Sequence, residues 1–210
     1  MPSNKRRPTR AKSVSPPKKK SEVTRTRILD AASQVLRKKG YTQTTLAEIA
    51  AAAGTQAGAM YYYFDSKHDL VESLARRSID RYLAHAKASL AKLPATASYR
   101  QRLKTAIRAH LDRSLRSNDF LQSSRVFKQL SRELRERLIH HGKAYRMLFR
   151  NLIRDGQRKG EFRPDVDATL SSLILMGVLI WCVDWYRPGK MSIDGLVDHI
   201  YLTLMQGIER

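Results

Sequence analysis

The sequence predicts an all-α protein of about nine helices, with a small three-helix domain at the N-terminus and a larger helical domain after it. Apolar residues recur at spacings of three and four along most of the chain, which is the period of an amphipathic helix. Capping-box patterns precede two of these segments, and Pro or Gly separates several others. We find no convincing alternation of apolar and polar residues of the kind that marks a strand.

The composition points to a polyanionic partner. Lys and Arg number 40 against 19 Asp and Glu, so the formal net charge is +21 and the pI is about 10.5. A nucleic acid and an anionic membrane surface both fit this charge. The longest apolar run, residues 173–183, is shorter than the roughly 20 residues that span a bilayer, which predicts a buried helix and no membrane partner.

Cysteine usage and the N-terminal residues bear on the compartment. Cys182 is the only cysteine, which excludes an intramolecular disulfide and a zinc knuckle and fits a reducing compartment. We expect it to fill a gap in the core. The basic N-terminal residues are followed by an amphipathic segment instead of an apolar one, so no export signal is recognised and we expect a cytoplasmic protein.

The first elements are a basic arm and a helix. Residues 1–22 are rich in Pro, Ser, Lys and Arg and poor in apolar residues, which predicts a disordered arm. The helical pattern starts at Thr24, and Gly40 follows it as a C-cap. The apolar face of this first helix is formed by Ile28, Ala32, Val35 and Leu36.

A capping box marks the start of the second helix. In "TLAE", the Thr45 hydroxyl and the Glu48 carboxylate each satisfy a backbone N–H group that has no partner in the helix. The second helix therefore runs from about Leu46 to just before Gly54, and a short third helix carries "AGAMYYYF".

The rest of the chain is predicted as longer helices. A capping-box-like pattern from Ser66 to Asp69 starts a fourth helix, which extends toward Leu93 and is stopped by Pro94. Further helical patterns cover residues 98–117, 119–129, 131–159, 166–186 and 193–208. We expect a small helical domain over 23–67 and a larger helical domain over 68–210.

The second and third helices form a helix-turn-helix pattern. They are joined by the tight turn "AAAGTQ", and in this motif the second helix of the pair enters the major groove of DNA. Residues 24–74 resemble the N-terminal domain of the TetR family of transcriptional regulators. The resemblance is carried by "KKGY", "TTLAEIA", the "AG" of the turn, "YYYF" and the "SK" that opens the fourth helix.

The resemblance implies a homodimeric, ligand-responsive regulator that binds a double-stranded DNA operator, more often a repressor than an activator. It also implies a DNA-binding domain over 23–67 and a ligand-binding and dimerisation domain over 68–210. A two-fold dimer presents two third helices about one turn of DNA apart, so the operator is expected to be pseudo-palindromic. Such a protein would be associated with the nucleoid. Effector binding would move the fourth helix and change the spacing of the two reading heads. The C-terminal end is also similar to family members that regulate lipid or steroid breakdown.

The third helix is predicted to have two faces. Met60 and Phe64 point inward, toward Leu46 and Ile49, while the outward face is uncharged. Tyrosine hydroxyls can bind phosphate oxygens, their rings can contact thymine methyl groups, and glutamine suits adenine. The expected DNA-reading residues are Gln56, Ala57, Gly58, Ala59, Tyr61 and Tyr62.

Three questions stay open about the third helix and the N-terminal arm. Gln56 stands where the family usually has a Ser-type cap, so it is either a base reader or a cap. The tyrosines are either readers or interface aromatics, and the arm either contacts DNA or only aids solubility. Positions that resemble the family's phosphate contacts are Thr44, Thr45 and Lys67.

Candidate effector and interface residues lie in the larger domain. Aromatic residues of the middle helices line a ligand cavity or simply form core, and the candidates are His110, Phe120, Phe127, Tyr145, Phe149 and Trp181. A stripe of Arg146, Arg150, Arg154 and Arg158 is either a solvated face or a clamp for a phosphate-bearing ligand such as an acyl-coenzyme A. The last two helices are apolar around most of their surface and predict a dimer interface through Leu173, Met176, Gly177, Ile180, Leu196, Ile200 and Leu204.

Other classes of function are less well supported. The chain has no Gly-rich phosphate loop, no GxSxG elbow and no HExxH helix, so we expect no enzyme, no catalytic residue and no cofactor. Glu136 and His140 are spaced to share a helix face, but an ion pair is the simpler expectation than a metal site. A non-specific architectural DNA-binding protein is the competing hypothesis, because the basic arm and net charge would suit it.

Overall fold

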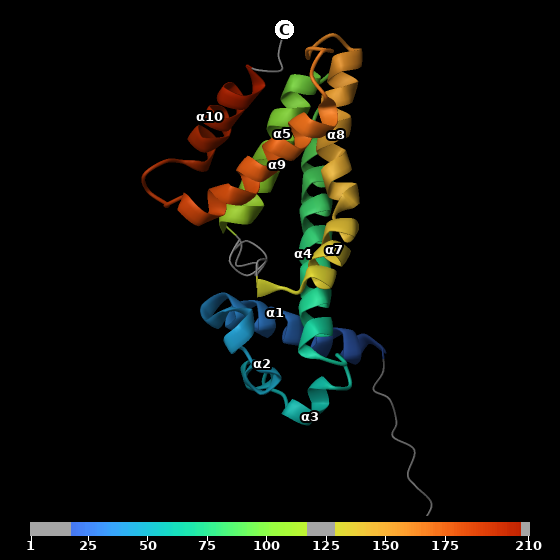
Figure 1. The fold of residues 1–210 in the computed structure, drawn as a ribbon, viewed down its shortest axis with the longest axis vertical. Helices are drawn as coiled ribbons and strands as arrows, with labels where there is room; N and C mark the ends of the chain where they lie inside the picture. Colours follow the sequence, from blue (N-terminus) through green and yellow to red (C-terminus); the bar gives the residue numbers. More distant parts are fainter. Residues whose placement is uncertain (1–17, 117–128, 207–210) are drawn as a thin grey trace, which may run out of the picture.

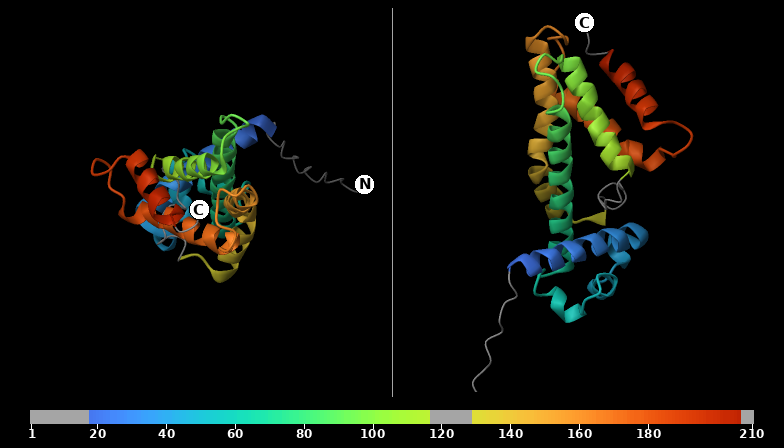
Figure 2. Two further views of the ribbon diagram at one scale, coloured as in Figure 1. Left: turned by 90° about the horizontal axis from the view of Figure 1, so that it is seen from above. Right: turned by 180° about the vertical axis from the view of Figure 1, so that it is seen from behind.

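The computed structural model describes residues 18–116 and 129–206. These residues form nine α-helices, labelled α1 to α5 and α7 to α10, and contain no β-strand (Figure 1). Helices α1 to α3 lie at one end of the molecule, and the long helix α4 runs from this end into the larger domain (Figures 1 and 2). The all-α prediction is confirmed.

Helix α1, Lys18–Gln43, begins earlier than expected. Residues 18–22, assigned to the disordered arm by composition, are helical. Lys and Glu are good helix formers, and extending an existing helix requires no new nucleus. The regular helical geometry of α1 is interrupted at Gly40, where the sequence predicted the helix end. Gly40 has non-helical angles (φ 79°, ψ 173°) that glycine adopts readily.

The predicted capping boxes fix the next helices. Helix α2, Leu46–Ala52, starts with Thr45 Oγ1 accepting from the Glu48 N–H group and Glu48 Oε2 accepting from the Thr45 N–H group, at 3.2 and 2.9 Å. Helix α3, Ala57–Met60, is only four residues long. Helix α4, Lys67–Leu90, is capped by Ser66, whose hydroxyl accepts from the Asp69 N–H group.

A compact core holds this end together. Met60 and Phe64 are fully buried and pack with Ile49, as the helical spacing predicts. Leu36 of α1 and Leu70 of α4 complete the same cluster. Because α4 contributes to this core, a movement of α4 must displace α1 to α3 with it.

The larger domain contains α5 (Tyr99–Arg116), α7 (Arg132–His141), α8 (Lys143–Arg158), α9 (Ala168–Trp185) and α10 (Ile193–Met205). The single helix predicted over 131–159 is wrong, because Gly142 caps α7 and separates it from α8. Glycine has the lowest helix propensity after proline, which favours a break there. Apart from Gln129, the helix expected over 119–129 lies outside the described residues.

The core of the larger domain includes a close helix contact at Gly156. A Cβ atom at this position would overlap the Phe162 ring and lie 3.0 Å from Tyr99 Cβ. Phe162 is fully buried, so its ring has no free space into which to move. Cys182 fills the same core, as predicted, and burial raises the pKa of its thiol to about 11.

Gly156→Ala is therefore expected to destabilise the protein by about 2 kcal/mol, because overpacking outweighs the small gain in helix propensity. Urea unfolding of the two proteins measures this difference. The matched control is Gly58→Ala, since nothing lies within 4 Å of a Cβ atom at Gly58. Equal stability losses in the two variants would contradict the packing argument.

Candidate DNA-binding surface and regulatory domain

The end of the molecule formed by α3 presents uncharged side chains to solvent. Tyr61 and Tyr62 are 63% and 57% exposed, and the neighbouring Ala57 and Gly58 are exposed as well. Ala59 is half-buried between this face and the core. Gln56 occupies the N-cap position of α3, but its side chain makes no capping hydrogen bond. Its amide therefore remains available for a base edge.

The expected phosphate contacts divide into exposed and inward-facing groups. Thr45 is exposed at the start of α2. Thr44 is buried, and its hydroxyl donates to the Gly40 carbonyl at 2.7 Å. The Lys67 ammonium donates to the carbonyls of Tyr41 and Thr44, both at 2.9 Å.

In this structure Thr44 and Lys67 brace the corner between α1 and α2, which differs from the predicted phosphate contacts. Their spacing in the sequence matches the family pattern, but burial directs the Thr44 hydroxyl to a backbone acceptor.

A salt-bridged carboxylate strengthens the start of α2. Glu48 accepts a hydrogen bond from Lys39 and two from Thr45, which lowers the pKa of Glu48 to about 2. The carboxylate stays charged across the physiological range. It therefore keeps this cap intact, with the Thr45 side chain exposed to solvent.

Hydrogen bonds connect the DNA-binding end to the start of α7. Tyr41 Oη lies 2.7 Å from His68 Nδ1, and His68 Nε2 lies 3.1 Å from Ser131 Oγ, the N-cap of α7. The Tyr41 N–H group also donates to Gln129 Oε1 at 2.9 Å. These residues were not identified from the sequence, because the partners are 27 to 88 positions apart.

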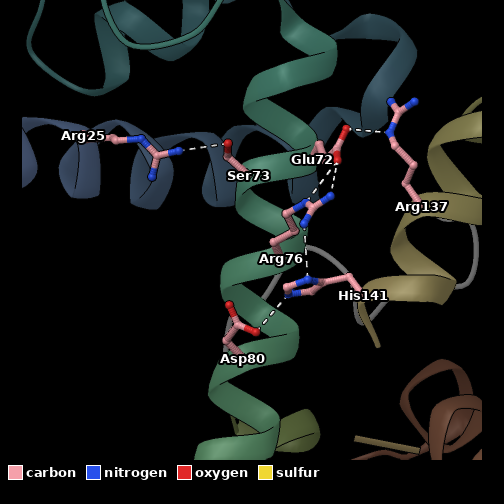
Figure 3. A network of polar contacts seen from close by, with 7 residues as sticks. All are labelled: Arg25, Glu72, Ser73, Arg76, Asp80, Arg137 and His141. Carbon is pink, nitrogen blue, oxygen red and sulfur yellow. Dashed lines mark hydrogen bonds and ion pairs between the residues drawn. The ribbon is translucent and has the colours of Figure 1, made fainter. Parts of the chain in front are cut away.

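A second polar network joins α4 to α7 (Figure 3). Glu72 accepts hydrogen bonds from Arg76 and from Arg137, and these arginines lower the pKa of Glu72 against an opposing effect of burial. His141 lies between Arg76 and Asp80, at 3.3 and 2.9 Å. The position of α4 is thus tied to the helix that follows residue 131.

The predicted effector residues form a packed aromatic cluster. His110 is buried between Tyr82 and Tyr145, and its Nδ1 lies 2.9 Å from the Tyr145 hydroxyl. Burial lowers the pKa of His110 to about 4, opposed by its hydrogen bond to the Leu179 backbone. Burial also raises the pKa of Tyr145 well above its ordinary value. Phe149 packs edge-on against Tyr145.

Three effector candidates remain, of which the structure describes only Trp181. Trp181 is 62% exposed and packs against Trp185 on the outer side of α9, so the prediction that it lines an internal cavity is wrong. The apolar residues of α9 surround most of the helix, which made its inward face difficult to identify. Phe120 and Phe127 lie outside the described residues.

The arginine stripe lies on α8 beside a pocket. Arg150 and Arg154 line a pocket of about 540 Å³ together with Gln157 and residues 164–169. Arg150 Nε is buried without a hydrogen-bond partner among the described residues. Arg154 and Arg158 both approach Asp155, at 3.5 Å. The arginine stripe is therefore partly buried, which differs from the fully solvated helix face that was one of its two interpretations.

Helix α9 exposes a broad apolar face. Only 28% of this 18-residue helix is buried, although its length and composition also satisfy a simple criterion for a membrane span. The expectation of a buried helix is met on one side only. The exposed apolar residues are Leu170, Leu173, Ile174, Ile180, Trp181 and Trp185, with Gly177 exposed among them.

The predicted interface set needs correction at three positions. Met176, Leu196 and Ile200 are buried in the core of their own domain, and Leu204 is half-buried against it. Helices α9 and α10 are both apolar enough that helical spacing alone did not distinguish the face that packs internally from the face left exposed.

The chain matches two family models. One, described as "Tetracyclin repressor-like, C-terminal domain", covers residues 96–208, and the other, "Bacterial regulatory proteins, tetR family", covers residues 28–74. The chain belongs to the TetR family. The predicted helix-turn-helix lies inside the second match, and α9 lies inside the first. Members of this family are DNA-binding regulators rather than enzymes, and the relatives support a repressor.

Individual relatives align over most of the chain. The HTH-type transcriptional repressor KstR2 of Rhodococcus jostii is 27% identical over 186 residues, which cover 88% of this chain and 90% of the relative. The probable HTH-type transcriptional regulator ArpR of Pseudomonas putida is 31% identical, with coverage of 69% and 72%. The structure of the fatty acid degradation regulator FadR from Bacillus halodurans superimposes with a TM-score of 0.78 at 26% identity, covering 89% and 97% of the two chains.

For Glu136 and His140, an ion pair was expected in preference to a metal site. Within residues 18–116 and 129–206, no group of three His, Cys, Asp or Glu side chains is placed to hold a metal ion. Glu136 pairs with Arg132 at 2.8 Å, one turn earlier on α7, instead of with His140.

Proposed function

We propose that this TetR-family protein is a homodimeric repressor that reads a pseudo-palindromic operator through α3 and releases it when an effector binds. It would act in the cytoplasm, in association with the nucleoid. The observation that carries this proposal is the exposed, uncharged surface of Gln56, Ala57, Gly58, Tyr61 and Tyr62 at the end of the molecule. A basic protein with an uncharged reading surface separates sequence recognition from electrostatic attraction.

The chemistry of this surface suits base readout. The small residues Ala57 and Gly58 let α3 approach the DNA closely, and the Gln56 amide can bind both edge groups of adenine. The tyrosine rings can contact thymine methyl groups while their hydroxyls donate to phosphate oxygens. Thr45 can add a phosphate contact beside them. Lys67 and Thr44 would act indirectly, by holding the corner in place.

Tyr62→Ala is expected to weaken operator binding by about tenfold or more, because a good base or phosphate contact contributes roughly 1–3 kcal/mol. Tyr62→Phe separates the two contributions: it keeps the ring contact and removes only the hydroxyl. Fluorescence anisotropy with a labelled operator measures both. Ile139→Ala on α7 is the matched control, since it removes an exposed apolar side chain remote from α3. Unchanged affinity in Tyr62→Ala would remove this residue from the reading surface.

Dimerisation through the exposed face of α9, together with Leu202 of α10, completes the proposal. Monomeric proteins rarely leave so many contiguous apolar side chains in water. In Figure 1, α9 and α10 lie at the end opposite α3, so a two-fold partner there would leave both reading heads free. A two-fold pair of heads requires two half-sites.

The effector we propose is a hydrophobic molecule that carries phosphate, such as a long-chain acyl-coenzyme A. The pocket beside Arg150 and Arg154 would bind the phosphates, and the aromatic residues around His110 would rearrange to admit the apolar part. The name of the similar FadR protein supports this class of effector. Movement in this domain would reach α4 and the corner at Tyr41 through Gln129 and Ser131.

Titration with a long-chain acyl-coenzyme A should raise the melting temperature and release the operator. Arg150→Gln should weaken the affinity for the acyl-coenzyme A about tenfold, because it removes a charge-assisted hydrogen bond. Both effects should then require about tenfold more ligand. Arg132→Gln on the surface of α7 serves as a control of the same chemistry. If wild-type protein shows neither effect, this effector class is wrong, although DNA binding is untouched by that result.

A non-specific architectural role is the second candidate, and the net charge of +21 is the observation that favours it. Charge alone produces salt-dependent binding without a preferred site. A footprint on one short palindrome supports the repressor, whereas uniform coating of DNA supports the architectural role.

A further inference from the structure

Four arginine side chains from two helices line one pocket in the angle between α1 and α4. Arg25 comes from α1, and Arg76, Arg77 and Arg81 come from α4. With Ser73, Asp80 and Ala84 they line an open surface pocket of about 460 Å³, a volume within the range of small-molecule sites. Figure 3 shows Arg25 reaching Ser73 where the two helices cross, with Arg76 and Asp80 farther along α4.

Two of these arginines have carboxylate partners. Arg76 donates two hydrogen bonds to Glu72, at 3.0 and 2.8 Å. Arg77 pairs with Asp30 at 2.8 Å, which joins α4 to α1. These pairs fix the direction of the two side chains, so the pocket is lined by guanidinium groups whose positions are already set before a ligand arrives.

The other two arginines have no carboxylate partner in the described ranges. Arg25 donates to the Ser73 hydroxyl at 2.9 Å. No hydrogen bond or ion pair joins the Arg81 side chain to another described residue. These two guanidinium groups face the same pocket from different helices, an arrangement in which their charges repel unless an anion lies between them.

The local charge balance matches a dianion. The pocket and its ion pairs contain five guanidinium groups, since Arg137 shares Glu72 with Arg76. Against them stand three carboxylates, those of Asp30, Glu72 and Asp80. The excess of two positive charges equals the charge of one phosphate monoester, and guanidinium groups bind phosphate oxygens in pairs.

Only the Arg81 end of the pocket lies far from the reading surface, because the Arg25 guanidinium stacks on the Phe64 ring, 5.0 Å from its centroid. Arg81 lies fourteen residues beyond Lys67 on α4, which corresponds to about 21 Å along the helix. Operator phosphates beside α3 would meet the beginning of α4 instead. The ligand is therefore expected to be a free molecule.

We propose that this α1–α4 arginine pocket binds a small phosphate-bearing molecule at a site separate from the effector site proposed in the larger domain. The bound phosphate would accept hydrogen bonds from Arg25 on one helix and Arg81 on the other. It would thereby hold the DNA-binding domain against α4, so ligand binding stabilises the folded protein.

Isothermal titration calorimetry of the full-length protein with inorganic phosphate and with pyrophosphate, at ionic strength held constant with sodium chloride, tests this site. We expect saturable binding of one or both anions, accompanied by a higher melting temperature. Arg81→Gln and Arg25→Gln should each weaken binding about tenfold, because each removes a charge-assisted hydrogen bond. Arg132→Gln, at an exposed position on α7, should bind as the wild type does.

Melting temperatures without added anion establish that the variants fold. Arg81 is exposed and has no described partner, so its replacement is not expected to disturb the native state. Absence of saturable binding in the wild type overturns the proposal. So does equal binding by Arg81→Gln, Arg25→Gln and Arg132→Gln, since the anion would then bind elsewhere, for example beside Arg150. Neither result affects the proposed operator recognition.

Discussion

Ile174→Asp is expected to convert the dimer into monomers. Ile174 is 61% exposed on α9, among the apolar side chains proposed to meet the partner subunit. A two-fold interface would bury two uncompensated carboxylates at once, and one buried unpaired charge costs about 3–5 kcal/mol. The dimer should therefore weaken by at least a hundredfold, and operator affinity should fall with it, because each monomer holds only one half-site.

Sedimentation velocity measures the mass of this variant, and anisotropy measures its affinity for the operator. Val23→Asp is the matched control for the mass: it places the same charge at an equally exposed apolar position, on α1, outside the proposed interface. A dimeric Ile174→Asp protein would show that the exposed face of α9 is not where subunits meet.

Acidification is expected to destabilise the protein through His110. Its pKa is lowered from 6.5 to about 4 by burial, so the folded state keeps the ring neutral while the unfolded state takes up a proton below pH 6.5. The contribution of the neutral ring to the free energy of unfolding is fully present above pH 6.5. It is lost as the pH falls toward 4, where the folded state is protonated too. The total loss is about 3 kcal/mol.

Urea unfolding at several pH values between 7 and 4 measures how steeply the free energy of unfolding falls as the pH is lowered. His110→Gln should flatten this slope, because the group that titrates differently in the two states is gone. His199→Gln, at an exposed position on α10, should keep the wild-type slope. If His110→Gln retained the full dependence on pH, another group would be responsible and the burial of His110 would not be the cause.

Local patterns predicted the DNA-binding end well. The Thr45 and Ser66 caps, the stop at Gly40 and the inward Met60 and Phe64 all depend on residues within a few positions of one another. Hydrophobic spacing and capping chemistry act over this range. The sequence was less informative about Thr44, whose burial depends on how α1 and α2 pack together.

The larger domain was harder to predict because its decisive contacts are distant in sequence. Met176 and Ile180 are both apolar residues of α9, yet one is buried and the other exposed. Only the positions of α5 and α8 determine which face of α9 packs inside. The bond from Tyr41 to Gln129 crosses between domains, and the contact from His68 to Ser131 joins the start of α4 to the start of α7. No spacing rule identifies such pairs.

We propose that the uncharged α3 surface reads the DNA sequence while basic residues supply general affinity. Selection of binding sites from random duplex DNA tests it most directly, with the full-length protein, a variant lacking residues 1–17 and the Tyr61→Ala/Tyr62→Ala variant side by side. Deleting 1–17 leaves all of α1 in place. We predict the same pseudo-palindrome for the first two proteins, with weaker and less salt-dependent binding after the deletion, and loss of that palindrome in the tyrosine variant. Enrichment of no sequence by the full-length protein, or an unchanged palindrome in the tyrosine variant, would contradict the claim.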